Sequence, residues 1–114
     1  MNYLTNISGV SKETLHLVST DIAQSFSLSN LHNTQGKLPI SCLITVEGND
    51  VRFTHSIVPI SGASGALLAL GHLLYDRGNY LISNTRNIQN FQFINAVTGS
   101  AADLMVTMFY SIGE

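Results

Sequence analysis

Two runs of alternating apolar residues, separated by four turn-forming residues, constrain the fold more than any other feature of this sequence. In ISCLITVEGNDVRFTHSIV, residues 40–58, every second position of 40–46 and of 51–57 is apolar, with His55 as the one exception. This two-residue period places those side chains on one face of an extended chain. Gly48 and Asn49 between the runs tolerate a positive φ. The segment therefore predicts a β-hairpin with one buried face.

The same alternation continues along most of the chain and sets the fold class. Further strands are expected at five places: 14–18, 22–28, 79–84, 88–96 and 103–111. The last two are expected to be joined by a hairpin-sized loop containing Gly99, and residues 29–39 to form a long connection. Seven or eight short strands with turns between them predict a single all-β domain over 1–114, an antiparallel β-sandwich that is jelly-roll-like.

The alternation lapses after Pro59. Apolar residues between Ala63 and Leu74 have the three-and-four spacing of an amphipathic helix, but Gly65 and Gly71 argue against a long one. We therefore expect one short helical or loop insertion around 62–75, at an open end of the sandwich.

Charge is scarce, which limits the classes of partner. Charged residues make up 11% of the chain and the net charge is −2, so no basic surface is expected to hold nucleic acid or an anionic membrane. The sequence has no signal-peptide pattern and no apolar run long enough to span a bilayer, and production in a cytoplasm is expected. The single cysteine, Cys42, is expected to be a buried thiol. A surface with few charges suits self-association and an ordinary soluble domain equally.

No residue pattern predicts catalysis, a metal or a cofactor. Ser64 between Gly62 and Gly65, with His72 downstream, imitates a serine-nucleophile turn, but the second glycine of that motif is absent. The four histidines lack the short spacings of metal ligands, and no two acidic residues stand out as a pair. His55, on the inward phase of its strand, would titrate at mildly acidic pH if buried.

Sugar binding by a β-sandwich usually requires exposed aromatic rings. The chain has no tryptophan, and Tyr3, Tyr75 and Tyr80 are its candidate exposed rings. Tyr75 and Tyr80 are the ligand-contact residues expected for this alternative.

The order of four segments resembles small β-sandwich virion accessory proteins of tailed bacteriophages. These segments are the LITVEGNDVRF hairpin, the following GHLL, the NIQNFQFI strand and the closing LMVTMFY, and the similarity covers about residues 38–110. The chain departs from that pattern at 59–71, which is longer and rich in Gly and Ala, and at YDRGN, residues 75–79. The resemblance implies a non-enzymatic capsid cement or decoration subunit at the surface of a virion, assembled in the host cytoplasm.

That role requires surfaces that neighbouring subunits cover. Large apolar residues on the outward phase of the strands are the expected contacts with the major capsid protein and with further copies, in a dimer or trimer: Leu43, Leu81, Met105 and Phe109. If instead both faces of the strands were covered within one chain, these residues would be part of its own core. The alternative functions are a receptor- or carbohydrate-binding sandwich at the tail or neck of the particle and, less favoured, a small hydrolase.

Overall fold

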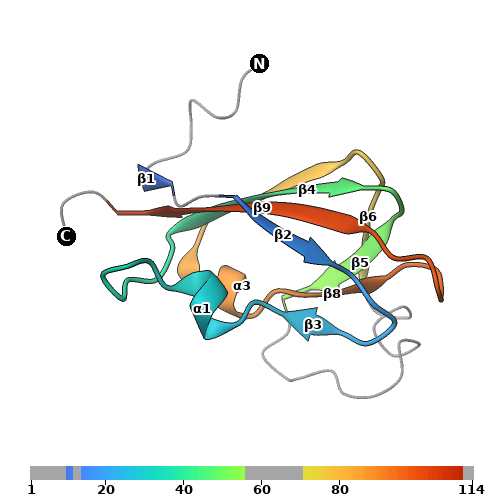
Figure 1. The fold of residues 1–114 in the computed structure, drawn as a ribbon, viewed down its shortest axis with the longest axis horizontal. Coiled ribbons are helices and arrows are strands. Elements are labelled where there is room, and N and C mark those ends of the chain that lie inside the picture. The colour runs from blue at the N-terminus through green and yellow to red at the C-terminus, as the bar shows by residue number, and fades with distance from the viewer. Residues whose placement is uncertain (1–9, 12–13, 56–70, 112–114) are drawn as a thin grey trace.

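Two antiparallel β-sheets pack face to face in the computed structural model, which describes residues 10–11, 14–55 and 71–111 (Figure 1). The five-stranded sheet consists of β1 (Val10–Ser11), β2 (Leu15–Val18), β4 (Ser41–Glu47), β7 (Asn79–Ile82) and β9 (Asp103–Tyr110). The four-stranded sheet consists of β3 (Gln24–Ser25), β5 (Val51–Thr54), β6 (His72–Leu74) and β8 (Gln92–Asn95). This all-β sandwich is the predicted fold class.

The pairing of the strands follows the jelly-roll order. β2 pairs with β9, β3 with β8, β4 with β7 and β5 with β6. The segment from β2 to β9 is thus folded back on itself as a double-stranded ribbon, with β2 and β9 at its open end and β5 and β6 at its closed end. The pairs of β4 with β9 and of β5 with β8 then join these strand pairs into two sheets. A double-stranded ribbon wrapped in this way is the jelly-roll arrangement.

This order corrects the predicted hairpins. β4 and β5 are joined by a short turn but belong to different sheets, and β8 and β9 do likewise. β4 is flanked by β7 and β9 instead. An alternating sequence shows which face of a strand is buried, but not which strand pairs with it. The same alternation is therefore found whether the turn returns to the same sheet or crosses to the other one. The predicted turn is present, with Gly48 at φ 99°.

Apolar side chains from both sheets fill the space between them. Cys42, Ile44 and Val46 of β4 and Val51 and Phe53 of β5 all face this core, as their alternation predicts. Every second residue of β9 also faces this core, because buried and half-buried residues alternate along the whole strand.

Cys42 is one of the core residues, as expected for a buried thiol. Its side chain is buried, and this burial raises the pKa of the thiol to about 12. Because thiolate is the reactive form of cysteine, Cys42 is an inert packing residue at neutral pH.

Two short helices occupy the ends of predicted strands and the connections beside them. α1 (Leu28–Leu31) begins after Ser27, whose hydroxyl accepts a hydrogen bond from Asn30 N, and it follows a β3 of only two residues. α3 (Thr85–Gln89) begins after Asn84, whose side chain accepts from Asn87 N. Ser and Asn satisfy the free N–H groups at a helix start, and these local caps override the alternation.

The expected insertion around 62–75 is only partly described. His72–Leu74 form β6, so the helical spacing that includes Leu73 and Leu74 is wrong there. Their pairing with Arg52 and Val51 gives a strand its hydrogen-bond partner. Residues 62–70, with Ser64 and its flanking glycines, lie outside the described part of the chain. No helix within the described ranges is long and apolar enough to cross a membrane.

Candidate functional site

The outward-facing side of the five-stranded sheet, here called the outer face, carries all four predicted interface residues. Leu43 lies opposite Leu81 on β7, and Met105 and Phe109 of β9 lie opposite Thr45 and Ser41 of β4. All four apolar side chains are half-buried. The sheet register therefore brings together residues that are far apart in the sequence.

Strand β2 adds to the outer face, which the sequence did not indicate. His16 lies opposite Met105, and exposed Val18 lies opposite Asp103. His16 Nε2 is 2.8 Å from Asp103 Oδ1, and the hydroxyls of Thr14 and Thr107 are 2.8 Å apart. The outer face thus combines an apolar centre with polar pairs on the β2 side.

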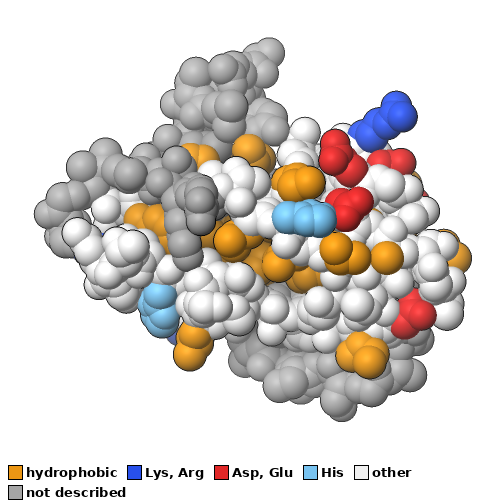
Figure 2. Space-filling model, in the orientation of Figure 1, with side chains coloured by type: hydrophobic (Ala, Val, Ile, Leu, Met, Phe, Trp, Pro, Cys, Tyr) orange, Lys and Arg blue, Asp and Glu red, His pale blue; other side chains and the backbone are white. Residues whose placement is uncertain are grey.

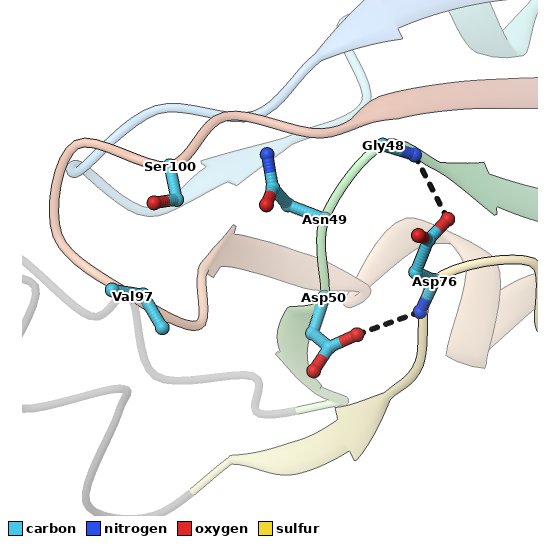
Figure 3. Close-up of a pocket in the computed structure, with 6 residues that line it drawn as sticks. All are labelled: Gly48, Asn49, Asp50, Asp76, Val97 and Ser100. Carbon is cyan, nitrogen blue, oxygen red and sulfur yellow. Dashed lines mark hydrogen bonds between the residues drawn. The ribbon is translucent and has the colours of Figure 1, made fainter.

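A second candidate site is a depression where three crossing loops meet at one end of the sandwich. Its lining comes from the β4–β5, β6–β7 and β8–β9 connections, and its volume is about 150 Å³. The lining residues are Gly48, Asn49, Asp50, Asp76, Val97 and Ser100 (Figure 3). The jelly-roll order explains this meeting, because each of these loops crosses from the five-stranded to the four-stranded sheet or back.

Hydrogen bonds between the loops hold the depression in shape. Asp76 N donates to Asp50 Oδ1 at 2.7 Å, and Gly48 N donates to Asp76 Oδ1 at 2.9 Å (Figure 3). Asn49 Nδ2 donates to Ala101 O at 2.7 Å. Each bond joins two different loops, so the lining side chains are positioned before any ligand arrives.

A buried polar network lies at the same end of the molecule, beside the depression. Asn95 of β8 accepts a hydrogen bond from the Ser19 hydroxyl through Oδ1 and donates through Nδ2 to Asp21 Oδ1 at 2.8 Å. Gly99 N also donates to Asp21 Oδ1, and Ala102 N donates to Ser19 Oγ, both at 2.8 Å. These bonds tie the β2–β3 connection to the β8–β9 loop.

Acidic residues gather at this end, which the sequence did not predict. Every acidic residue in the described ranges lies in or directly beside one of the crossing loops: Asp21, Glu47, Asp50, Asp76 and Asp103. Figure 2 shows acidic side chains toward the right-hand end of the visible face. Their positions at strand ends were evident from the sequence, but their proximity follows from strand order alone.

Asp21 links acid stability to this network. The hydrogen bond from Gly99 N, and then that from Asn95, lower the pKa of its carboxyl below the ordinary 3.8. The carboxylate therefore stabilises the fold above the unfolded-state pKa, and this stabilisation is lost as pH falls through the lower, folded-state pKa. We expect Asp21→Asn to reduce the free energy of unfolding at pH 7 and to flatten its fall below about pH 4. Urea unfolding at several pH values measures both, and an unchanged acid profile would contradict this assignment.

The two predicted ligand-contact tyrosines differ in position. Tyr75 is 63% exposed and immediately precedes Asp76 in the β6–β7 connection. Tyr80 instead faces the core, with its ring centroid 4.7 Å from that of Phe53. The prediction that Tyr80 presents an exposed ring is wrong, because position 80 is on the inward phase of β7. Tyr3 lies outside the described residues.

His55 contacts Tyr80 and the α3 backbone. Its Nδ1 is 3.0 Å from Asn87 O and its Nε2 is 2.7 Å from Tyr80 Oη. A carbonyl only accepts, so in the neutral ring Nδ1 carries the proton and Nε2 accepts from the tyrosine hydroxyl. Burial raises the pKa of Tyr80, which keeps that donor protonated. The expected titration of His55 stays a prediction.

The described residues contain no candidate metal site, and comparisons with known proteins found no match. Over residues 14–55 and 71–111, no three His, Cys, Asp or Glu side chains are grouped so as to hold a metal ion. No protein-family model, curated protein or solved structure matches the chain.

Proposed function

We propose that this protein is a structural subunit of a tailed-phage particle, a capsid cement or decoration protein that binds the major capsid protein and further copies of itself. The observation that supports this most is the outer face. It presents Leu43, Leu81, Met105 and Phe109 on one side of a sheet whose other side covers the core. Apolar side chains grouped on an outer sheet face are typical of protein contacts.

A second copy of the chain is the proposed occupant of the outer face. The face is formed by one rigid sheet, so two copies can pack with the same residues on each side of a two-fold axis. The low charge of the chain keeps repulsion between copies weak. Remaining outward surface, including the acidic loop end, is then free for the capsid protein.

A charge introduced at the apolar centre of the outer face tests self-association. We expect wild-type protein to sediment as a dimer, as the two-fold packing requires, and Leu43→Lys to sediment as a monomer, because a charge buried against a second copy without a partner is strongly unfavourable. Leu28→Lys is the matched control, since Leu28 is exposed on α1 and not on the five-stranded sheet. The circular dichroism of both variants should match wild type.

Two results would contradict the proposal. Wild-type protein that remains monomeric at high concentration would exclude the self-association. Absence of the protein from purified particles, measured by mass spectrometry, would exclude the virion role. A copy number in the hundreds is expected for a head protein, whereas a dozen or fewer would indicate the neck or tail.

A further inference from the structure

We propose that the loop-end depression binds one ring of a neutral saccharide. This binding site is separate from the outer face and goes beyond the proposed structural role. It is formed by the six residues that line the depression, from three loops that the jelly-roll order brings together.

The size of the depression fits a single six-membered ring. Its volume is about 150 Å³, and an engineered cavity of about this volume in another protein accommodates benzene. The depression is open to solvent, so further sugar units of a longer glycan can extend away from the bound ring.

The polar lining consists mainly of acceptors that are already oriented. Asp50 and Asp76 each use one carboxylate oxygen to accept a backbone N–H from a neighbouring loop. A second oxygen remains on each carboxylate to accept a bond from a ligand. Asn49 is anchored through its Nδ2, which leaves its Oδ1 as a further acceptor. Sugar hydroxyls are the matching donors, and the fixed positions of these acceptors reduce the ordering cost of binding.

An apolar wall and a hydroxyl complete the match to a sugar. Val97 is 62% exposed although it is a large apolar residue, and its methyl groups can cover the C–H surface of a ring. The Ser100 hydroxyl, on the same β8–β9 loop, can donate as well as accept. An apolar wall beside a few placed polar groups is typical of small-molecule sites.

The charge of the lining selects against anionic sugars. Two carboxylates contribute to the depression, and its lining contains no Lys or Arg. A phosphate or carboxylate group on the ligand would be repelled by Asp50 and Asp76, and no basic residue of the lining offsets this repulsion. Neutral hexoses and N-acetylhexosamines are therefore the expected class.

Titration of ¹⁵N-labelled protein tests the site directly. The probes are glucose, galactose, mannose, fucose and N-acetylglucosamine, with glucose 6-phosphate and glucosamine as charged comparisons. We expect at least one neutral sugar to shift the resonances of Asn49, including its side-chain amide, and of Val97 and Ser100. Glucose 6-phosphate should cause no such shifts.

Two variants connect the shifts to the depression. Val97→Arg places a long side chain at an exposed position, so it should fold normally and abolish the shifts. Asp50→Asn keeps an oxygen to accept from Asp76 N but replaces the ligand-facing acceptor, and should weaken binding roughly ten- to hundredfold. Glu47→Gln is the matched control, because it removes one negative charge at the same end of the molecule but outside the lining. This variant should bind the sugar as wild type does.

The outcomes separate this proposal from the structural role. No shift with any neutral sugar, shifts that survive Val97→Arg, or binding of glucosamine alone would each overturn it, the last by indicating an ammonium site. Leu43→Lys should leave sugar binding unchanged, because the outer face and the depression are different surfaces.

Discussion

Replacing Phe91 by alanine is expected to destabilise the protein by about 3–5 kcal/mol, the range for removing a large aromatic side chain from a core. Phe91 is fully buried, directly before β8. Its ring centroid lies 5.4 Å from that of Phe26, 5.6 Å from Phe53 and 5.8 Å from Phe93. These three rings lie in or directly beside strands of the four-stranded sheet, and the ring of Tyr80 on β7 of the other sheet lies 6.5 Å from Phe91. The cavity would therefore be lined from both sheets and could not be closed by one shift.

Urea unfolding measures this loss. The midpoint should fall while the slope m stays unchanged, because the substitution alters stability and not the surface exposed on unfolding. Leu28→Ala is the matched control: Leu28 is 69% exposed, so its change should stay within about 0.5 kcal/mol. A Phe91→Ala effect below about 1 kcal/mol would contradict the shared aromatic core, since large core truncations cost several times that.

Replacing Asn95 by leucine is expected to cost about 1–3 kcal/mol through the Ser19 hydroxyl alone, which would lose its buried acceptor. Asn95 and Ser19 are both buried, and Asn95 also bonds Asp21. Leucine has a similar size, so packing changes little and the lost hydrogen bonds dominate. The β8–β9 loop should also loosen, because Asp21 holds Gly99.

A double-mutant cycle isolates the Ser19–Asn95 interaction. Ser19→Ala leaves the Ala102 N–H without its side-chain acceptor, so it is also destabilising. If the two side chains form one network, the double variant should lose less stability than the sum of the single variants. Strict additivity would show that the two residues act independently. Hydrogen exchange at Gly99 and Ala102 gives a second, local measurement.

The inward phase of the strands was predictable from the sequence. Cys42, Ile44 and Val46 are buried as their alternation indicates, and Gly48 and Gly99 have the positive φ expected at turns. Strands β2, β7 and β9 fall within the predicted ranges 14–18, 79–84 and 103–111. Periodicity reports burial on one face, and every strand of a sandwich has such a face.

The predicted candidate-site residues had mixed outcomes. Leu43 and Met105 were correctly placed on the outward phase, because outward and inward positions alternate along one strand. Tyr80 was misplaced, although the outward assignment of its neighbour Leu81 already implies an inward Tyr80: it lies opposite inward-facing Ile44. The depression has no local signal, because its lining comes from three turns more than 20 residues apart.

By itself, the order of apolar and polar residues determined that this chain forms a β-sandwich and which side chains fill it, because alternation is a local property of each strand. Only the tertiary structure decided that β4 and β5 part into different sheets, that the first strand meets the last, and that five acidic residues share one end. Strand pairing depends on hydrogen bonds and packing between distant segments, and many pairings satisfy the same alternation.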